Sequence, residues 1–138
     1  MRPFGNAVIV GGTILSTLGC GGAVVASNDG AVVTGAWNGA NLSLTLDERG
    51  GATEYDCAHG GLSAPVIVDA TGAFRVTGVH VPEQGGPIRL DEIPDSLPAV
   101  YVGRWTGDAI TMRVLVGVDT LGPFTLRRDA PSQLLKCL

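Results

Sequence analysis

Residues 35–46 read GAWNGANLSLTL, and this stretch decides the fold because an alternating segment directly follows a tight turn. In an extended chain, the three leucines of LSLTL share one face and the hydroxyl side chains share the other. The Asn38-Gly39 dipeptide tolerates the positive φ angles that short hairpin turns demand. The stretch therefore predicts a β-hairpin whose second strand has one buried and one solvated face.

The same pattern returns 68 residues later, where residues 103–114 read GRWTGDAITMRV. The two blocks align without a gap as a strand, a Gly-x-Trp-x-Gly turn and an alternating strand. We interpret the repeat as one hairpin used twice, with Trp37 and Trp105 each filling the core beside its turn. The alternative is that either ring stacks on a bound ligand, so both tryptophans are candidate ligand-binding residues.

Further segments alternate in the same way and are separated by short turns rich in Gly, Asn and Asp. The predicted strands are Ala31–Trp37, Asn41–Glu48, Thr53–Ala58, Pro65–Val68, Ala73–Val81, Ala99–Thr106, Ala109–Val116, Phe124–Arg127 and Leu134–Cys137. We therefore predict an all-β fold, an antiparallel meander of about eight strands that closes as a small β-barrel. A β-sandwich is the alternative. The longest irregular segment, Pro82–Pro98, is interpreted as a crossover rather than a cover over one barrel end.

The Gly35-Ala36-Trp37 sequence near the first strand resembles the opening motif of lipocalin- and avidin-type barrels. This resemblance implies a closed barrel in preference to a sandwich. Closure also removes the sheet edges that a small exported protein would otherwise have to protect.

The N-terminus has the composition of an export signal. Arg2 is a minimal positive region, and Ala7–Leu18 is apolar, uncharged and too short to span a bilayer. Thr17-Leu18-Gly19-Cys20 resembles the lipobox of bacterial lipoproteins, which implies lipidation of Cys20. Ordinary signal-peptidase cleavage after Val24-Val25-Ala26 and a cytosolic chain with an apolar first strand remain alternatives. We assign residues 1–26 to the signal peptide or lipobox and a short linker, and residues 27–138 to a single β-barrel domain.

The chain has three cysteines, so lipidation or removal of Cys20 would leave Cys57 and Cys137 as one disulfide. The body also resembles small bacterial secreted and lipoprotein sequences through its Cys57–Gly60, Gly85–Pro87 and Lys136–Leu138 segments. That resemblance implies export and a disulfide, and it implies no catalytic activity. A metal site at Cys57 and His59 is the alternative, but two ligands fall short of the four that structural zinc requires.

The remaining polar residues do not form a catalytic pattern. His59 and Tyr55 are kept as candidate ligand-binding residues, whereas His80 is expected to face solvent between two inward valines. Glu54 and Asp56 share one strand face, which we interpret as a solvated polar surface rather than an acid–base pair. No Gly-x-Ser-x-Gly elbow or phosphate-binding loop is present, so we predict no enzyme, no cofactor and no metal.

Composition narrows the class of partners. The formal net charge is −4 and basic residues do not cluster, which argues against nucleic-acid binding. We therefore expect an exported protein of the bacterial outer membrane, periplasm or cell exterior, anchored to the membrane through a lipid on Cys20. Its expected role is non-catalytic, either structural or binding an unidentified protein. The alternative is a carrier of a small apolar ligand inside the barrel.

Overall fold

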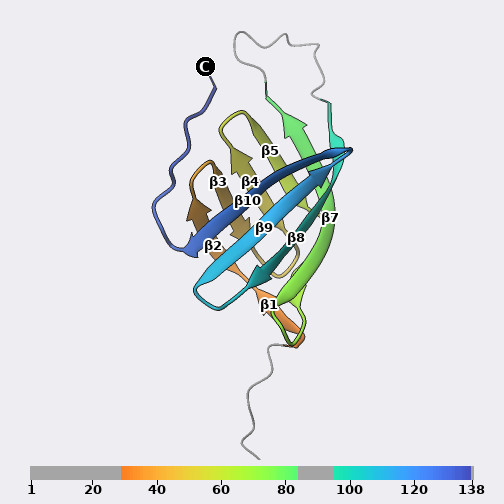
Figure 1. Ribbon diagram of the computed structural model, residues 1–138, viewed down its shortest axis with the longest axis vertical. Helices are drawn as coiled ribbons and strands as arrows, with labels where there is room; N and C mark the ends of the chain where they lie inside the picture. Colours follow the sequence, from red (N-terminus) through yellow and green to blue (C-terminus); the bar gives the residue numbers. More distant parts are fainter. Residues whose placement is uncertain (1–28, 84–94, 138) are drawn as a thin grey trace, which may run out of the picture.

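The computed structural model describes residues 29–83 and 95–137, and this part of the chain is all β (Figure 1). The strands are β1 (Ala31–Val33), β2 (Gly35–Gly39), β3 (Leu42–Leu46), β4 (Gly51–Tyr55), β5 (Ala58–Leu62), β6 (Val66–Val68), β7 (Ala73–Pro82), β8 (Leu97–Trp105), β9 (Ala109–Val116) and β10 (Asp119–Arg128). Among the described residues, no helix is long and apolar enough to cross a membrane. The predictions for residues 1–26, including Cys20, and for most of Pro82–Pro98 lie outside these ranges.

Eight of the strands close into a barrel in the order β10-β2-β3-β4-β5-β7-β8-β9. Every neighbouring pair is antiparallel, and the strands follow one another around the barrel in chain order apart from β6. The predicted antiparallel meander and its closure as a barrel are confirmed, and the sandwich is not formed. Because β7 and β8 pair directly, the segment between them joins neighbours in the barrel.

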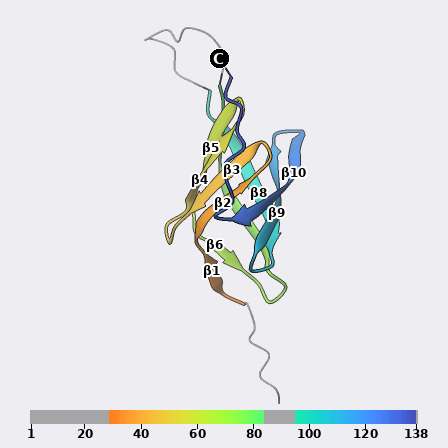
Figure 2. The ribbon, with the colours of Figure 1, turned by 90° about the vertical axis from the view of Figure 1, so that its left-hand side faces the viewer.

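The predicted first strand, Ala31–Trp37, is in fact two strands in two sheets. β1 pairs with β6 in a separate two-stranded sheet at the lower end of the molecule, whereas β2 enters the barrel (Figure 2). Gly35 has a φ of 109°, a conformation that side chains other than glycine rarely adopt. The chain therefore turns at this glycine, and a continuous strand through it was the wrong prediction.

Three other predicted strands differ from the structure. Thr53–Ala58 is divided by a turn at Asp56-Cys57 into the ends of β4 and β5. β10 is longer than the predicted Phe124–Arg127, because a register shift between Leu121 and Phe124 interrupts its alternation. Leu134–Cys137 forms no strand, and one parallel bridge between Ala40 and Gln133 is its nearest ladder contact.

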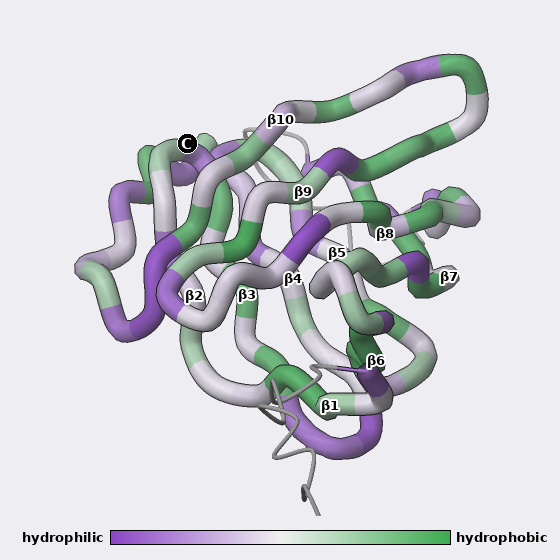
Figure 3. Tube along the Cα trace, turned by 60° about the horizontal axis from the view of Figure 1, so that its bottom comes forward, coloured by the Kyte–Doolittle hydropathy of each residue, from purple (hydrophilic) through white to green (hydrophobic). Residues whose placement is uncertain are grey.

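The centre of the barrel is filled by its own side chains. Hydrophobic and hydrophilic residues interleave along the barrel strands (Figure 3), as expected when successive side chains point inward and outward. The largest side chains with almost no accessible surface are Trp37, Leu42, Leu44, Tyr101, Ile110, Met112 and Leu126. An eight-stranded barrel is just wide enough for such side chains to fill it, so its middle is a packed core.

The barrel closes through a short seam. Only two register pairs, Arg127 with Asn38 and Arg128 with Trp37, join β10 to β2, whereas β7 and β8 pair through eight. Within the described part of the chain, residues 119–126 of β10 pair with β9 alone. The upper part of β10 therefore has no ladder pairing to β2.

Candidate functional site

The chain after β10 forms an extended C-terminal strap, which we define as residues 129–137. It runs along the outside of the barrel towards the upper end in Figure 1, the end formed by the β2–β3, β4–β5 and β9–β10 turns. Asn38 Nδ2 donates to the carbonyl of Ala130 at 2.7 Å near the start of the strap. At its far end the amides of Leu135 and Cys137 donate to Asp56, to Oδ1 and to the carbonyl oxygen respectively, both at 2.9 Å.

A disulfide fastens the strap to the β4–β5 turn. Cys57 and Cys137 are 80 residues apart in sequence, and their Cα atoms are 5.2 Å apart. The predicted pairing is confirmed, but Cys57 lies in a turn rather than on a strand. The disulfide therefore joins a turn to an extended tail and does not brace two strands against each other.

A charged cluster surrounds the disulfide on the outer surface. Lys136 Nζ donates to Glu54 Oε2 at 2.7 Å, to Glu83 Oε2 at 3.1 Å and to the carbonyl of Tyr55 at 2.9 Å. His59 Nδ1 lies 2.9 Å from the other oxygen of Glu83, so this carboxylate joins the Lys136 and His59 side chains. The hydrogen bonds from His59 and Lys136 hold the pKa of Glu83 below its ordinary range.

We call these four side chains, Glu54, His59, Glu83 and Lys136, the surface clamp, because they hold the end of the strap against the barrel. Its side chains are a third to a half exposed, so each ion pair contributes well under about 1 kcal/mol to stability. The Cys57 sulfur is bonded in the disulfide, and the His59 ring is hydrogen-bonded to the Glu83 carboxylate. Among the described residues, no three His, Cys, Asp or Glu side chains are placed to hold one metal ion. The candidate residue His59 thus helps to position the strap.

A second cluster lies inside the upper end of the barrel. The ring of Tyr55 contacts the ring of His80 at a centroid distance of 5.0 Å and that of Phe124 at 6.0 Å, both edge to face. The expectation that His80 faces solvent was wrong. Phe74 and Val76 point inward on β7, and the two-residue period carries that face on to His80, while Val79 points outward.

The polar atoms of this inner cluster divide into two kinds. Tyr101 Oη donates to the carbonyl of Val79 at 2.7 Å and lies 3.3 Å from Thr53 Oγ1, so the hydroxyl is satisfied. By contrast, His80 Nδ1 is buried and has no hydrogen-bond partner among the described residues, and Tyr55 Oη has none within hydrogen-bond geometry, although the side chains of Thr53 and Tyr101 lie near enough to influence its pKa. Burial raises the pKa of Tyr55 above its ordinary range. Burial, and to a smaller degree the charge of His59, lowers the pKa of His80.

The two tryptophans of the repeat occupy different settings. Trp37 has no exposed surface, donates from Nε1 to the carbonyl of Thr34 at 3.2 Å and has the Arg128 guanidinium 4.5 Å from its ring centroid. Trp105 is partly buried, and its Nε1 has no partner in the described part of the chain. Both blocks form hairpins, but Trp37 pairs with Leu44 whereas Trp105 pairs with Ile110, a register two residues different.

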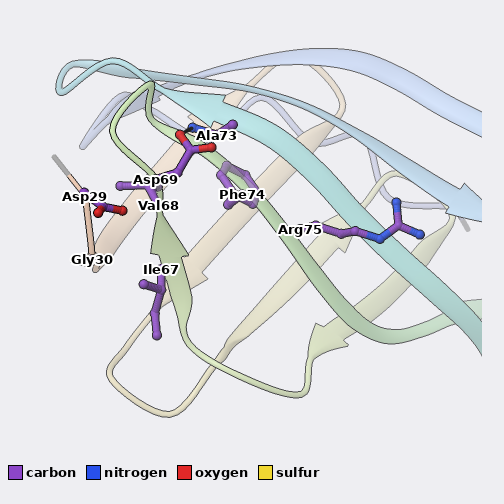
Figure 4. Close-up of a pocket in the computed structure, with 8 residues that line it drawn as sticks. All are labelled: Asp29, Gly30, Ile67, Val68, Asp69, Ala73, Phe74 and Arg75. Atoms are coloured by element: carbon purple, nitrogen blue, oxygen red, sulfur yellow. Dashed lines mark hydrogen bonds between the residues drawn. The ribbon is translucent and has the colours of Figure 1, made fainter.

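An open depression of about 480 Å³ lies at the opposite end of the molecule, between β6 and the start of β7 (Figure 4). Asp69 contributes a carboxylate to its wall, but Oδ1 already accepts from the backbone amides of Thr71 and Ala73 and from the Thr71 hydroxyl. These hydrogen bonds, that of the hydroxyl foremost, lower the pKa of Asp69. The carboxylate is thus committed to shaping the β6–β7 turn.

Comparison with known proteins adds no assignment. No family model matches the chain, and neither a curated protein nor a solved structure matches it.

The sequence therefore located part of what the structure brings together. It singled out Tyr55, His59, Cys57 and Cys137, which lie around the β4–β5 turn. It missed His80 as a buried neighbour of Tyr55 and Lys136 as the cation of the clamp. The inward phase of β7 was the available signal for His80, since Phe74 and Val76 precede it at even spacing.

Proposed function

We propose that this chain is an exported protein that acts in the bacterial envelope or outside the cell without catalysing a reaction. The observation that carries the proposal is the Cys57–Cys137 disulfide at the end of the strap. Disulfides persist in oxidising compartments and are rare in the bacterial cytosol. A cross-link that holds an otherwise exposed tail suits a protein that works where it cannot be reduced.

The sequence of the leader supports a lipid anchor within the same proposal. Lipidation of Cys20 would attach the barrel to a membrane and leave the other two cysteines free to pair. The expected location is then the outer membrane or periplasm, with plain secretion as the alternative. The folded domain would act by binding a partner protein or by a structural role, since the carboxylates around the disulfide are bonded to Lys136 and His59, and the Asp69 carboxylate that accepts from the Thr71 hydroxyl shapes a turn.

Carriage of a small ligand is the second candidate function. The middle of the barrel is occupied by side chains such as Trp37 and Tyr101, so a ligand would have to sit at one end. The unpartnered Tyr55 Oη and His80 Nδ1 are the observation that favours the upper end.

Intact-mass measurement of the full chain produced in a bacterial host tests the first proposal. We expect loss of residues 1–19, addition of a diacyl or triacyl group, and two thiols that react with an alkylating agent only after reduction. A Cys20→Ser variant should lose the lipid and keep the protected pair. An unprocessed chain with three reactive thiols would refute export, and removal of a leader without lipid would leave secretion in place of anchoring.

A further inference from the structure

The upper end of the barrel holds two buried polar atoms whose hydrogen bonds are unmade. Tyr55 is 6% exposed and His80 is 8% exposed, and neither Tyr55 Oη nor His80 Nδ1 has a partner among the described residues. A polar group that is buried without a hydrogen-bond partner destabilises the folded state. Here two such groups belong to rings whose centroids are 5.0 Å apart, which is unfavourable in a purely structural core. The arrangement suits a site that receives a polar group.

The two rings lie close to the rim of the barrel. Tyr55 is the last residue of β4, and His80 lies two residues before the end of β7. The cross-strand partner of His80 is Leu97, the first residue of β8, which is 39% exposed. Phe124, on the other side of Tyr55, is only partly buried. The two buried rings are therefore flanked by apolar side chains that are partly exposed to solvent.

The part of β10 without ladder pairing to β2 lies beside this cluster. Phe124 belongs to the segment of β10 that pairs with β9 alone, above the two register pairs of the β10–β2 seam. A small molecule that reaches the rings along this side of β10 breaks no β10–β2 ladder pair, since both pairs lie lower in the strand. Entry consequently requires movement of side chains and leaves the sheet intact.

The chemistry of the walls selects a class of ligand. Three rings that meet edge to face present flat apolar surfaces to an aromatic body. The side chains that act on the Tyr55 hydroxyl, those of Thr53 and Tyr101, are uncharged, so a charged group would be desolvated without compensation. Burial keeps the His80 imidazole neutral near pH 7, which lets it and the Tyr55 hydroxyl bond a neutral hydroxyl or amide.

We propose that the rim between Tyr55, His80 and Phe124 binds a small neutral aromatic molecule that carries one hydrogen-bonding group. The inference rests on the second candidate function above, that this barrel holds a small ligand, and it gives that ligand a place and a chemical class. It is independent of whether the chain is exported or lipidated.

Titration of the disulfide-bonded protein with phenol, followed by nuclear magnetic resonance, tests the site. We expect saturable shifts of the His80 ring and of the Leu97 amide, and weaker binding of toluene and benzoate. Tyr55→Phe should weaken phenol binding about fivefold and leave toluene binding unchanged, as loss of one hydrogen bond predicts. Tyr101→Phe is the matched control, because that hydroxyl already has partners, and it should leave phenol affinity within about twofold of the parent protein.

The possible outcomes separate the site from the function on which it rests. Phenol shifts that Tyr55→Phe does not weaken, or that occur away from the rim, would overturn the site and leave a carrier with a different site. Equal affinity for phenol and toluene would overturn the role of the two polar atoms, as expected if they only hold a water molecule. Failure of all three probes to bind would count against both the site and the carrier function.

Discussion

Removal of the disulfide should cost a predictable part of the stability of the barrel. In the Cys57→Ser, Cys137→Ser double variant, the unfolded chain regains the entropy of a closed loop of 80 residues. The chain-entropy relation assigns such a loop about 4.5 kcal/mol at 25 °C. This is the full loss if the strap stays docked through its hydrogen bonds to Asp56 and through Lys136.

Those bonds alone do not keep the strap docked, and this lowers the expected loss of stability. They lie at exposed side chains, and ordering each residue of the strap costs about 1 kcal/mol in backbone entropy. When the strap detaches, the folded variant regains part of this backbone entropy, and this stabilises it relative to a folded state with an ordered strap. We therefore expect the free energy of unfolding to fall by about 2–4 kcal/mol.

Urea denaturation at pH 7, followed by the fluorescence of the buried Trp37 and the partly buried Trp105, measures this loss. The denaturant slope should rise in the variant, because the unfolded chain without the cross-link exposes more surface. Lys136→Met in the oxidised protein is the control and should cost less than about 1 kcal/mol. A double variant that loses less than about 1 kcal/mol at unchanged slope would refute the account of the disulfide as a restraint on the unfolded chain.

Three further predictions concern the inner cluster. Tyr101→Phe should lower the free energy of unfolding by about 1–2 kcal/mol, whereas Tyr55→Phe should leave it unchanged or raise it, and equal losses in urea melts would show that the Tyr55 hydroxyl is bonded. Because the folded-state pKa of His80 is lowered, the unfolded chain binds its proton more readily, so stability should fall as pH drops below about 6.5 and be independent of this group above about 7.5. A His80→Leu variant that keeps the same slope of stability between pH 5 and 7 would contradict that assignment. Gly60→Ala should cost about 2 kcal/mol or more, because a Cβ there would lie 2.5 Å from Tyr101 Oη, while Gly61→Ala, with 3.4 Å to its nearest atom, should cost much less.

The regular part of the fold follows from local alternation. The segments LSLTL and AITMRVLV form β3 and β9 with their apolar residues inward. In a sheet with one buried face, an alternating segment can bury its apolar side chains in one register only. β10 was only partly predicted, since its bulge between Leu121 and Phe124 shifts the alternation by a step. The turn at Asp56-Cys57 was missed because it contains neither Gly nor Pro.

The candidate site was harder to predict because its contacts are distant in sequence. Cysteine counting was sufficient for Cys57 and Cys137, since few alternatives exist once Cys20 is set aside. Lys136 meets Glu83 across 53 residues, and only the topology of the barrel and the course of the strap bring them together. Ion pairs of this kind leave no local pattern, whereas the inward phase of a strand does.

The position of the seam also sets the order in which the molecule can be assembled. Each hairpin of the meander joins strands that are close in sequence, so these can pair while the chain is still being made. The seam joins Trp37 to Arg128, and Cys137 follows every strand of the barrel. Closure and cross-linking are therefore the last events of assembly. A chain arrested before its last strand emerges exposes the free edge of β2, and the disulfide cannot lock it in that open form.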